Sequence, residues 1–305
     1  MKRLLSFLIL AMASQAVAHQ KVIIGHDARL PIKSSPARVQ KLGEAVGLMF
    51  SPIYKSVNSK GLIDLDFPTL GDSLDLCPGQ RFAKDRSAEI NCTGFLVAPD
   101  LVVTAGHCMI NTGTADNTRT PFCSDFEWYF GFDENKVNDL SPEDFYSCET
   151  VISVRHETIM RTIGVIESFG EDYALIKLDR PVKNRTPLKL ATGDVRQGEP
   201  LTMIGHPSGL PKIFSPIGKV ESNQEDLFYE VSLDSFGGNS GSPVMNRQNE
   251  VVGILVRGPE DYSWDERAQC RKAIKCSSTG RGCESHVKIF LPQVNRLDQI
   301  RDLLK

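Results

Sequence analysis

The second half of the chain contains short runs of β-branched and apolar residues separated by glycine or proline, and this spacing restricts the fold more than any other feature. The runs are Leu201–Gly205, Ile217–Glu221, Leu227–Leu233, Val251–Val256 and Val287–Leu291. Short strands with turns between them are typical of antiparallel β-barrels. The 287 residues that follow a predicted leader are enough for one large all-β unit or for two barrels of roughly 100 residues each.

The leader is residues 1–18, which predict a secretory signal peptide. Lys2 and Arg3 precede the apolar run Leu4–Met12, and residues 16–18 (Ala-Val-Ala) have the small-x-small pattern of a cleavage site. The apolar run is too short to span a bilayer, and we expect no other membrane segment. The sequence therefore predicts a secreted protein, extracellular or periplasmic, that does not associate with a membrane.

The charge balance argues against a nucleic-acid partner. Without the leader the chain has 33 Lys and Arg against 38 Asp and Glu, so it is mildly acidic. Binding of phosphates needs a basic field, and this composition does not supply one. We therefore expect no nucleic acid to bind.

Eight cysteines in an exported chain predict disulfides. They are Cys77, Cys92, Cys108, Cys123, Cys148, Cys270, Cys276 and Cys283. None forms a Cys-x-x-Cys pair, and no two histidines lie beside them at metal-site spacing. We therefore expect no zinc site, no other metal and no cofactor.

The stretch Cys92–Thr104 predicts a β-hairpin, because two β-rich runs flank an Ala-Pro-Asp turn. His107 follows at the end of the second strand, flanked by small residues, so it is held at a rim where it can reach another element. A bridge between Cys92 and Cys108 would tie the hairpin back on itself and fix this turn, contributing about 3 kcal/mol.

Asp172 opens a run that is typical of a buried strand, Asp-Tyr-Ala-Leu-Ile-Lys-Leu over residues 172–178. A carboxylate in that position is costly unless a polar group meets it. An imidazole N–H is the partner that a catalytic base needs. A structural cap is the competing role for Asp172.

Residues 237–243 (Gly-Gly-Asn-Ser-Gly-Ser-Pro) have the composition of a nucleophile loop. A serine hydroxyl is a poor nucleophile, so it needs a tight bend, a nearby base and N–H groups aimed at the oxyanion that forms. Glycines supply the unusual φ values and the bare backbone. If Ser240 is the nucleophile, the N–H groups of Gly238 and Ser240 are the expected oxyanion donors. The alternative is a plain turn between two strands.

His107, Asp172 and Ser240 occur in the order His, Asp, Ser, separated by 65 and 68 residues. In this order, and in the motifs Thr-Ala-Gly-His-Cys, Asp-Tyr-Ala-Leu-Ile-Lys-Leu and Gly-Asn-Ser-Gly-Ser-Pro around them, the sequence resembles the chymotrypsin-like serine proteases over roughly Ala45–Lys305. The resemblance implies a secreted serine endopeptidase that hydrolyses peptide bonds through an acyl-enzyme. Its partners would be protein or peptide substrates, and we expect a monomer.

The resemblance also implies the architecture. The fold would be all-β, with two antiparallel six-stranded barrels and a C-terminal α-helix. Residues 45–182 would form the barrel that carries His107 and Asp172, and residues 183–305 the barrel that carries Ser240. Residues 19–44 would be an N-terminal segment or a prosegment.

The branch that this sequence resembles most is the bacterial secreted one, which includes the glutamyl endopeptidases. Asn239 stands where animal trypsins have an aspartate that receives a freshly cut N-terminal ammonium and thereby orders the oxyanion hole. Asparagine has no charge for such a pair. We therefore expect that activation of this chain does not depend on that ion pair.

The resemblance implies Asp234, Ser235 and Gly258 as substrate-binding residues. Asp234 lies six residues before Ser240, where the trypsin-like branch has the carboxylate at the base of its primary pocket. A buried carboxylate favours Arg or Lys on the acyl side of the cut bond. Some glutamate-specific relatives have an aspartate nearby as well, but they also use a histidine near Leu255 that this chain lacks. Cleavage after Glu, or a non-catalytic binding module of the same fold, are the alternatives.

Further sequence features predict a loop, a terminal helix and the remaining disulfides. Residues 61–89 predict an extended surface loop, and apolar residues from Val294 to Leu304 recur at helical spacing. His156 and His206 are expected to be ordinary strand-end and turn residues. The remaining six cysteines allow 15 pairings. We expect Cys123 with Cys148, one pair among the last three cysteines, and Cys77 with the third.

Overall fold

The computed structural model describes residues 23–89, 91–110, 123–161, 166–258, 260–276 and 291–305.

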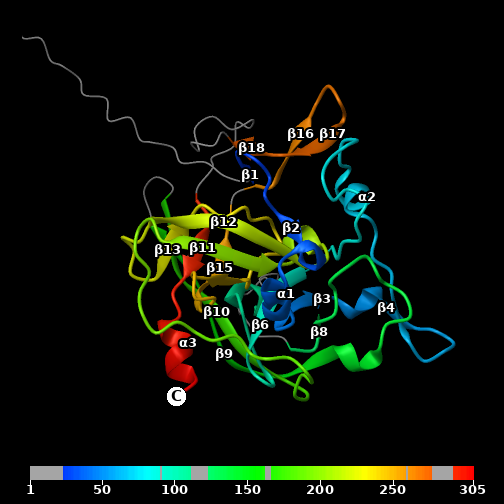
Figure 1. Ribbon diagram of the computed structural model, residues 1–305, viewed down its shortest axis with the longest axis horizontal. Coiled ribbons are helices and arrows are strands. Elements are labelled where there is room, and N and C mark those ends of the chain that lie inside the picture. The colour runs from blue at the N-terminus through cyan, green and yellow to red at the C-terminus, as the bar shows by residue number, and fades with distance from the viewer. Residues whose placement is uncertain (1–22, 90, 111–122, 162–165, 259, 277–290) are drawn as a thin grey trace, which may run out of the picture.

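Six strands close the first barrel. The ring runs through β3 (Val46–Phe50), β6 (Asn91–Ala98), β7 (Leu101–Thr104), β10 (Ile166–Leu178), β9 (Phe145–Arg161) and β8 (Glu127–Tyr129), which pairs with β3 again. Every pairing is antiparallel. β6, β9 and β10 lie below the second barrel in Figure 1.

Six further strands close the second barrel. They are β11 (Pro200–Gly205), β14 (Pro243–Met245), β15 (Val251–Arg257), β19 (Gln293–Asn295), β13 (Phe228–Val231) and β12 (Ile213–Ser222), which pairs back with β11. These pairings are also antiparallel. Two antiparallel six-stranded barrels with a C-terminal helix confirm the predicted fold class.

Large apolar side chains fill the interiors. Phe95 and Trp128 are fully buried in the first barrel, and Leu201, Val231 and Val294 are buried in the second. Each such side chain stabilises the fold by roughly 1.5–3 kcal/mol relative to exposure. β-propensity depends strongly on context, so this burial, more than local preference, explains why the short runs form closed sheets.

The N-terminal segment pairs with the second barrel and with a short strand outside the two barrels. It contains β1 (Ile23–Ile24), β2 (Leu30–Pro31), the 3-10 turn η1 (Ile32–Ser34) and α1 (Ala37–Gly43). β1 pairs in parallel with β18 (Lys275–Cys276), and β2 extends the second barrel by pairing with β12. This segment is therefore part of the folded unit.

Lys212 joins the N-terminal segment to the two barrels. The side chain is completely buried, and its Nζ donates to the carbonyls of Gly43 (2.8 Å) and Phe130 (3.2 Å). The same nitrogen pairs with Asp133 Oδ1 at 2.8 Å. A buried ammonium is costly unless it is paired and hydrogen-bonded, and these three contacts meet that requirement.

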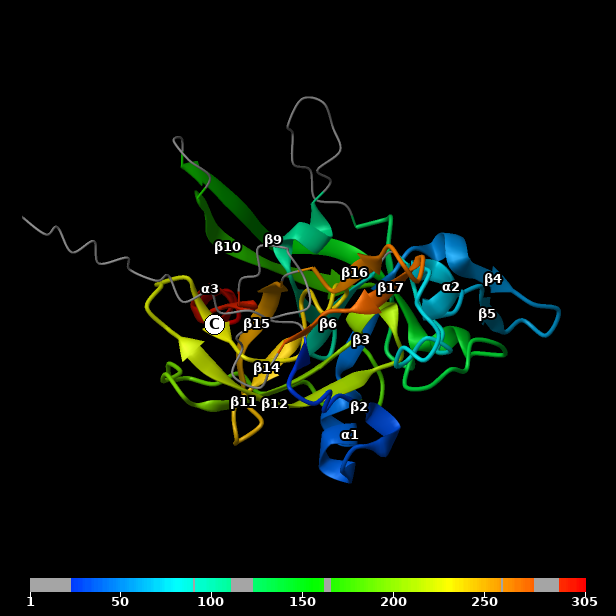
Figure 2. The ribbon, with the colours of Figure 1, turned by 90° about the horizontal axis from the view of Figure 1, so that it is seen from above.

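The region predicted as an extended surface loop is partly buried. After η2 (Pro52–Tyr54), a small hairpin of β4 (Lys55–Val57) and β5 (Ile63–Leu65) is followed by α2 (Leu70–Leu74). Phe67 and Leu70 are each 1% exposed. Isolated apolar residues among polar ones gave no periodic signal, so the prediction of a surface loop over residues 61–89 is corrected here. β4 and β5 lie at the opposite end of the molecule from α3 (Asp298–Leu303) in Figure 2.

The C-terminal helix is shorter than predicted. Val294 belongs to β19, and the helix α3 begins only at Asp298. Val294, Leu297 and Ile300 are all buried, which produced a helical period across a strand and a helix together. The strand predicted at Val287–Leu291 lies almost entirely outside the described residues.

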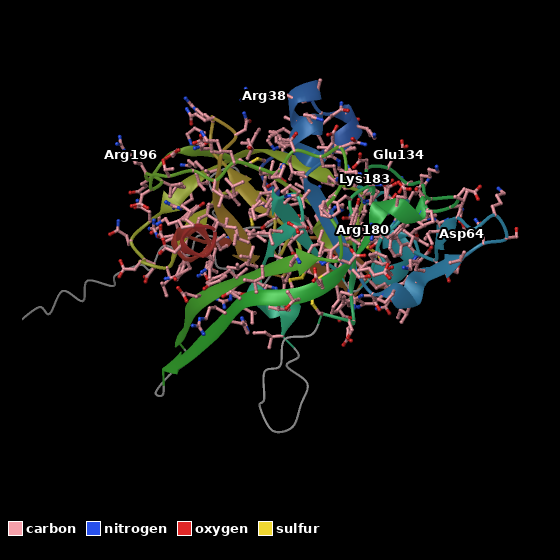
Figure 3. The ribbon with its side chains drawn as sticks, turned by 90° about the horizontal axis from the view of Figure 1, so that it is seen from below. Arg38, Asp64, Glu134, Arg180, Lys183 and Arg196 are labelled. Carbon is pink, nitrogen blue, oxygen red and sulfur yellow. A yellow bond between two sulfur atoms is a disulfide. The ribbon has the colours of Figure 1, made fainter. Side chains whose placement is uncertain are left out.

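The remaining elements are short connections around the barrels. They are η3 (Gly106–Met109), η4 (Pro142–Asp144), η5 (Pro207–Gly209) and the hairpin of β16 (Tyr262–Asp265) with β17 (Cys270–Ala273). Charged side chains of both signs, among them Asp64, Glu134 and Lys183, point outward over one face (Figure 3). Within the described ranges, no helix has the length and apolarity needed to cross a membrane.

Three disulfides join described residues: Cys92–Cys108, Cys123–Cys148 and Cys77–Cys270. The first closes the predicted hairpin, and the third ties the loop after α2 to β17 across 193 residues of sequence. A pairing of Cys276 with Cys283 falls outside the described residues.

Candidate active site

His107 is fixed by its backbone and by its ring. It lies in η3 directly after β7, next to the disulfide Cys92–Cys108. Its N–H donates to Asp172 Oδ1 at 2.9 Å, and its Nδ1 lies 2.9 Å from Asp172 Oδ2. A Cβ on Gly106 would lie 1.8 Å from the carbonyl oxygen of Arg155, so only glycine allows η3 to approach β9 this closely.

Asp172 is completely buried within β10, just after an irregularity in the pairing of β9 with β10. Burial alone would raise the pKa of this carboxyl. The hydrogen bonds from His107 and His156, together with the charge interaction with His107, outweigh burial and hold the pKa of Asp172 well below its usual range. Asp172 is therefore a carboxylate that holds the ring of His107 in one orientation.

Ser240 lies on a loop that is tied to the first barrel. Thr93 in β6 donates from its hydroxyl to the carbonyl of Gly238 (2.7 Å) and from its N–H to the carbonyl of Ser240 (2.8 Å). The N–H of Gly241 donates to Leu255 in β15 at 2.7 Å. Because Thr93 and His107 belong to the same barrel, these bonds set the position of Ser240 relative to His107.

Gly238 can only be glycine. Its φ is +84°, in the left-handed region, and a Cβ there would lie 2.0 Å from Asn91 Oδ1 and 2.5 Å from the carbonyl of His206. The N–H of Asn239 is bonded to the carbonyl of Phe236 at 3.0 Å. Among the described residues, no acceptor receives the N–H of Gly238 or of Ser240. These two donors are thus available to a ligand, as an oxyanion hole requires.

Asn239 is buried, at 1% exposed. Its Oδ1 accepts a long bond of 3.4 Å from the hydroxyl of Ser242, and both side chains face Gly205. An uncharged amide bonded to a hydroxyl gives this position no charge that would attract an ammonium. The expectation that activation does not depend on an ion pair at Asn239 stays a prediction.

His107 and Ser240 share one cleft of about 340 Å³. Its lining consists of His107, His156, Ser235, Phe236, Gly237, Ser240, Leu255, Val256, Arg257, Gly258 and Asp261. Of the predicted substrate-binding residues, Ser235 and Gly258 face each other, since a Cβ on Gly258 would lie 3.4 Å from Ser235 Oγ. Asp234 is buried and does not belong to the lining as far as the described residues show.

Asp261 is a carboxylate in the cleft that the sequence analysis missed. Its Oδ2 accepts the N–H of Gly237 at 2.5 Å. Burial raises the pKa of Asp261 to about 7. The hydrogen bond from Gly237 and the nearby charge of Arg29 lower this pKa, but by less. A single aspartate in a long loop gives no sequence signal for this role.

Two further groups that the sequence did not assign face Asp172. His156, expected to be an ordinary strand-end residue, pairs with Asp172 across β9 and β10, and its Nδ1 lies 3.5 Å from Oδ2. Arg257 at the end of β15 places Nη2 3.7 Å from the same oxygen. The ring centroids of His156 and His107 are 5.9 Å apart. Only the register of β9 against β10 could have revealed His156, and irregular pairing hides that register in the sequence. Arg257 comes from β15 of the second barrel, so only the fold brings it to Asp172.

Two groups of described residues bring potential metal-ligating atoms together. His107, His156 and Asp172 bring three donor atoms within 4.8 Å of one another. The guanidinium of Arg257 lies beside the same carboxylate oxygen and would repel a cation. The other donor group, Cys92, His107 and Cys108, includes a disulfide and so offers no thiolate. We assign no metal site to either set.

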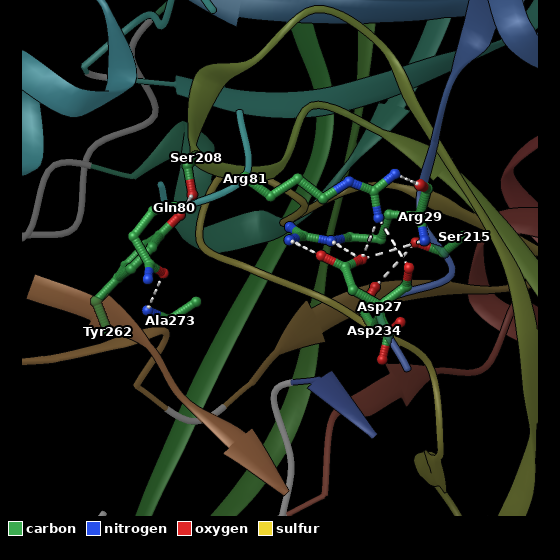
Figure 4. A network of polar contacts seen from close by, with 9 residues as sticks. All are labelled: Asp27, Arg29, Gln80, Arg81, Ser208, Ser215, Asp234, Tyr262 and Ala273. Carbon is green, nitrogen blue, oxygen red and sulfur yellow. Dashed lines mark hydrogen bonds and ion pairs between the residues drawn. The ribbon is translucent and has the colours of Figure 1, made fainter. Parts of the chain in front are cut away.

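The N-terminal segment supports one wall of the cleft. The guanidinium of Arg29, which is 3% exposed, lies 4.1 Å from the ring centre of Phe236. Arg29 forms two hydrogen bonds with Asp27 (2.9 and 2.8 Å), and Arg81 pairs with Asp27 at 2.9 Å. Figure 4 shows both guanidinium groups converging on Asp27. Residues before the first barrel thus pack directly behind a residue of the cleft.

A comparison with protein families identifies the family of this chain. The family model of the trypsin-like peptidase domain matches residues 92–254, more than half of the chain. This chain belongs to the trypsin-like peptidase family, which confirms the family predicted from its motifs.

Individual relatives are more distant. Glutamyl endopeptidase of Staphylococcus epidermidis is 39% identical over 71 residues, which are 22% of this chain and 24% of the relative. The chain thus matches about a quarter of the length of that curated relative. A solved Glu endopeptidase in complex with MPD is 17% identical, covering 83% of this chain and 94% of its own, with a TM-score of 0.46. A protease from M. tuberculosis in its active form is 12% identical, covering 94% and 88%, with a TM-score of 0.47.

Proposed function

We propose that this chain is a secreted serine endopeptidase in which Ser240 is the nucleophile, His107 the general base and Asp172 the residue that orients His107. The observation that carries the proposal is the anchoring of His107 to Asp172 by two contacts of 2.9 Å, in a cleft that also contains Ser240. This is the arrangement that an activated serine requires. The leader and the disulfides support secretion.

The reaction follows from these positions. His107 takes the proton of the Ser240 hydroxyl while its oxygen attacks the substrate carbonyl, and the N–H groups of Gly238 and Ser240 stabilise the oxyanion. His107 then gives that proton to the leaving amine, and the peptide bond breaks. Water, deprotonated by His107 in the same way, hydrolyses the acyl-enzyme and restores Ser240. Asp172 stabilises the imidazolium in both steps.

We propose cleavage after Arg or Lys. Asp261 places a carboxyl group in the cleft beside Gly237, and this group becomes charged as pH rises through its pKa of about 7. Ser235 and Gly258 line the same cleft and lie next to each other. Asp234, adjacent to Ser235 in sequence, is a second acidic residue and is buried. A site with this charge attracts a cationic side chain. Cleavage after Glu is the second candidate, because a relative with 39% identity over its matching region is a glutamyl endopeptidase.

The test uses peptides that differ only in Arg, Lys, Glu or Phe at the cut site. We expect Arg and Lys to give the highest kcat/KM, and a preference for Glu would contradict the specificity. Ser240→Ala should lower turnover by about 10⁶-fold. Ser56→Ala, an exposed serine on β4, serves as the control and should leave turnover unchanged. Normal cleavage by Ser240→Ala would overturn the mechanism.

A further inference from the structure

The N–H of Gly238, which we assign to the oxyanion site, belongs to a tight turn over residues 236–239. The N–H of Asn239 donates to the carbonyl of Phe236 at 3.0 Å, and Gly238 has a φ of +84°. A bond between the first and fourth residues and a positive φ at the third residue are the features of a type II β-turn. The N–H of Gly238 is therefore part of the central peptide of this turn, and its direction depends on how the turn is held.

Two hydrogen bonds hold the centre of the turn. The N–H of Gly237 donates to Asp261 Oδ2, and the carbonyl of Gly237 accepts the N–H of Ser208, both at 2.5 Å. The carbonyl of Gly237 and the N–H of Gly238 belong to one trans peptide, so they point in opposite directions. The bond from Ser208 to this carbonyl therefore fixes the direction in which Gly238 offers its N–H.

A cation of the N-terminal segment supports the first residue of the turn. The guanidinium of Arg29 lies 4.1 Å from the ring centre of Phe236, and these residues are only 3% and 4% exposed. A cation over an aromatic face is attracted by the ring, and more strongly where water is excluded. Two hydrogen bonds to Asp27, of 2.9 and 2.8 Å, hold the guanidinium in place (Figure 4). The ring of Phe236 is thus fixed on the side of the turn that faces away from the substrate.

The charge of Arg29 also acts on Asp261, the acceptor of the Gly237 N–H. Burial and the charge of Glu260 raise the pKa of Asp261, whereas the hydrogen bond from Gly237 and the charge of Arg29 lower it. Arg29 thus favours the carboxylate form, and a carboxylate accepts a stronger hydrogen bond than a neutral carboxyl group does. Two routes, one through Phe236 and one through Asp261, therefore lead from Arg29 to the same turn.

We propose that Arg29 is a positioning residue for the oxyanion site, because it holds Phe236 and with it the turn that presents the N–H of Gly238. The inference rests on the proposed peptidase function and adds to it a residue from outside the two barrels. Asn239, inside the turn, has no charge that would attract a cation, whereas Arg29 brings a positive charge to the outer side of the turn. Without Arg29 the turn adopts other forms as well, and kcat falls with the fraction of enzyme in the competent form.

Arg29→Met tests this role, because it keeps an unbranched side chain and removes the charge. The measured quantity is kcat per active site, with the active sites counted by complete labelling with a fluorophosphonate. We expect it to fall about tenfold, less than the loss of an oxyanion donor would cause. KM should change less, because the oxyanion forms only after the substrate has bound. A merely structural role would lower the number of active sites and leave kcat per site unchanged.

Arg81→Met is the matched control. Arg81 pairs with the same Asp27 carboxylate at 2.9 Å, and both guanidinium groups lie over the ring of Phe82, at 4.6 Å for Arg81 and 5.1 Å for Arg29. In the described part of the chain, Arg29 alone of the two lies over Phe236. Arg81→Met should therefore keep kcat per active site within about twofold of the wild type.

Phe236→Leu tests the route through the ring. In this background Arg29→Met should lower kcat per active site by much less than in the wild type, since two groups that act through one contact are not additive. Equal effects of Arg29→Met in both backgrounds would contradict the role of the ring. Arg29→Lys keeps a charge but lacks the planar fork, so its kcat per active site should lie several-fold below the wild type and above Arg29→Met.

An unchanged kcat per active site in Arg29→Met, or equal losses in Arg29→Met and Arg81→Met, would overturn the role of Arg29 while leaving the peptidase proposal standing. If Arg29→Met does not fold, Arg29→Lys decides alone, and a wild-type kcat per active site in that variant would overturn the role. Absence of Ser240-dependent cleavage of every peptide by the wild type would overturn the peptidase proposal itself.

Discussion

At the scale of single residues, the site contains side chains that their local sequence predicted and side chains that only the fold brings into place. His107, Asp172 and Ser240 each lie in a short motif with its own chemical logic, so they could be predicted. His156, Arg257 and Asp261 come from a strand register, a strand end and a loop, and none of these places can be derived from local composition. The resemblance to the trypsin-like branch implied Asp234, yet among the described residues Asp261 is the acidic side chain that lines the cleft.

Gly238→Ala should damage the oxyanion site. The φ of +84° and the 2.0 Å approach to Asn91 Oδ1 leave no room for a methyl group, so the loop must shift. We expect kcat to fall by about 10²–10³-fold, the usual cost of losing one oxyanion donor. Gly193→Ala is the control, since its Cβ would meet nothing within 4 Å. Kinetics and thermal unfolding of both variants check this, and equal kcat for both would contradict it.

Asp261 should make the fold less stable as pH rises. Its folded-state pKa of about 7 exceeds the ordinary 3.8, so the folded state holds a proton that the unfolded state releases. The free energy of unfolding should therefore decrease between about pH 4 and 7, by at most about 4 kcal/mol and by less because the side chain is partly exposed. Asp261→Asn should remove this contribution. Denaturant unfolding at several pH values measures the free energy of unfolding. The same dependence on pH in the wild type and in Asp261→Asn would count against this prediction.

At the scale of elements, the hairpin of β6 and β7 followed the prediction because alternation, turn and motif all agree there. The short strands β14 and β19 were not predicted, because three residues carry too little pattern. The sequence left two interpretations of residues 19–44, a segment of the fold or a prosegment. The pairing of this segment with β12 and β18, and the contact of Arg29 with Phe236, favour a permanent part of the fold.

The active protein should therefore retain residues 23–44. Removing them would expose the edge of β12, leave Lys212 without the carbonyl of Gly43 and remove the support behind Phe236. N-terminal sequencing together with intact mass of the secreted enzyme gives the answer. We expect a mature N-terminus before Ile23, and an active enzyme that begins after Gly43 would contradict this account.

At the scale of the whole molecule, two barrels supply the parts of one site. The resemblance to a known family predicted this architecture, whereas strand patterns alone left one all-β unit or two barrels open. The contacts that fix the relation of the barrels lie far apart in sequence, such as Thr93 with the loop of Ser240 and Lys212 with Asp133. Only the folded chain shows them.

Lys212→Met should loosen the joint between the barrels. It would remove the 2.8 Å partner of the half-buried Asp133, whose other cation, Lys33, lies 3.5 Å away. Breaking a fully buried pair typically costs about 3–5 kcal/mol in the free energy of unfolding, and we expect the lower end of that range here. Lys212→Met combined with Asp133→Asn should cost less than Lys212→Met alone. Lys219→Met, at a side chain 55% exposed, should change stability by less than about 0.5 kcal/mol. Denaturant unfolding compares the variants. A Lys212→Met protein as stable as the Lys219→Met control would refute the role of Lys212 in joining the barrels.

Covalent labelling with a serine-directed fluorophosphonate tests most directly whether the cleft activates Ser240. Peptide mass mapping of the labelled protein should find the phosphonyl group on Ser240, and labelling should be lost in His107→Ala, which removes the base, while Ser56 stays unmodified. Failure of the folded wild-type protein to react, or equal labelling of the His107→Ala variant, would contradict the account.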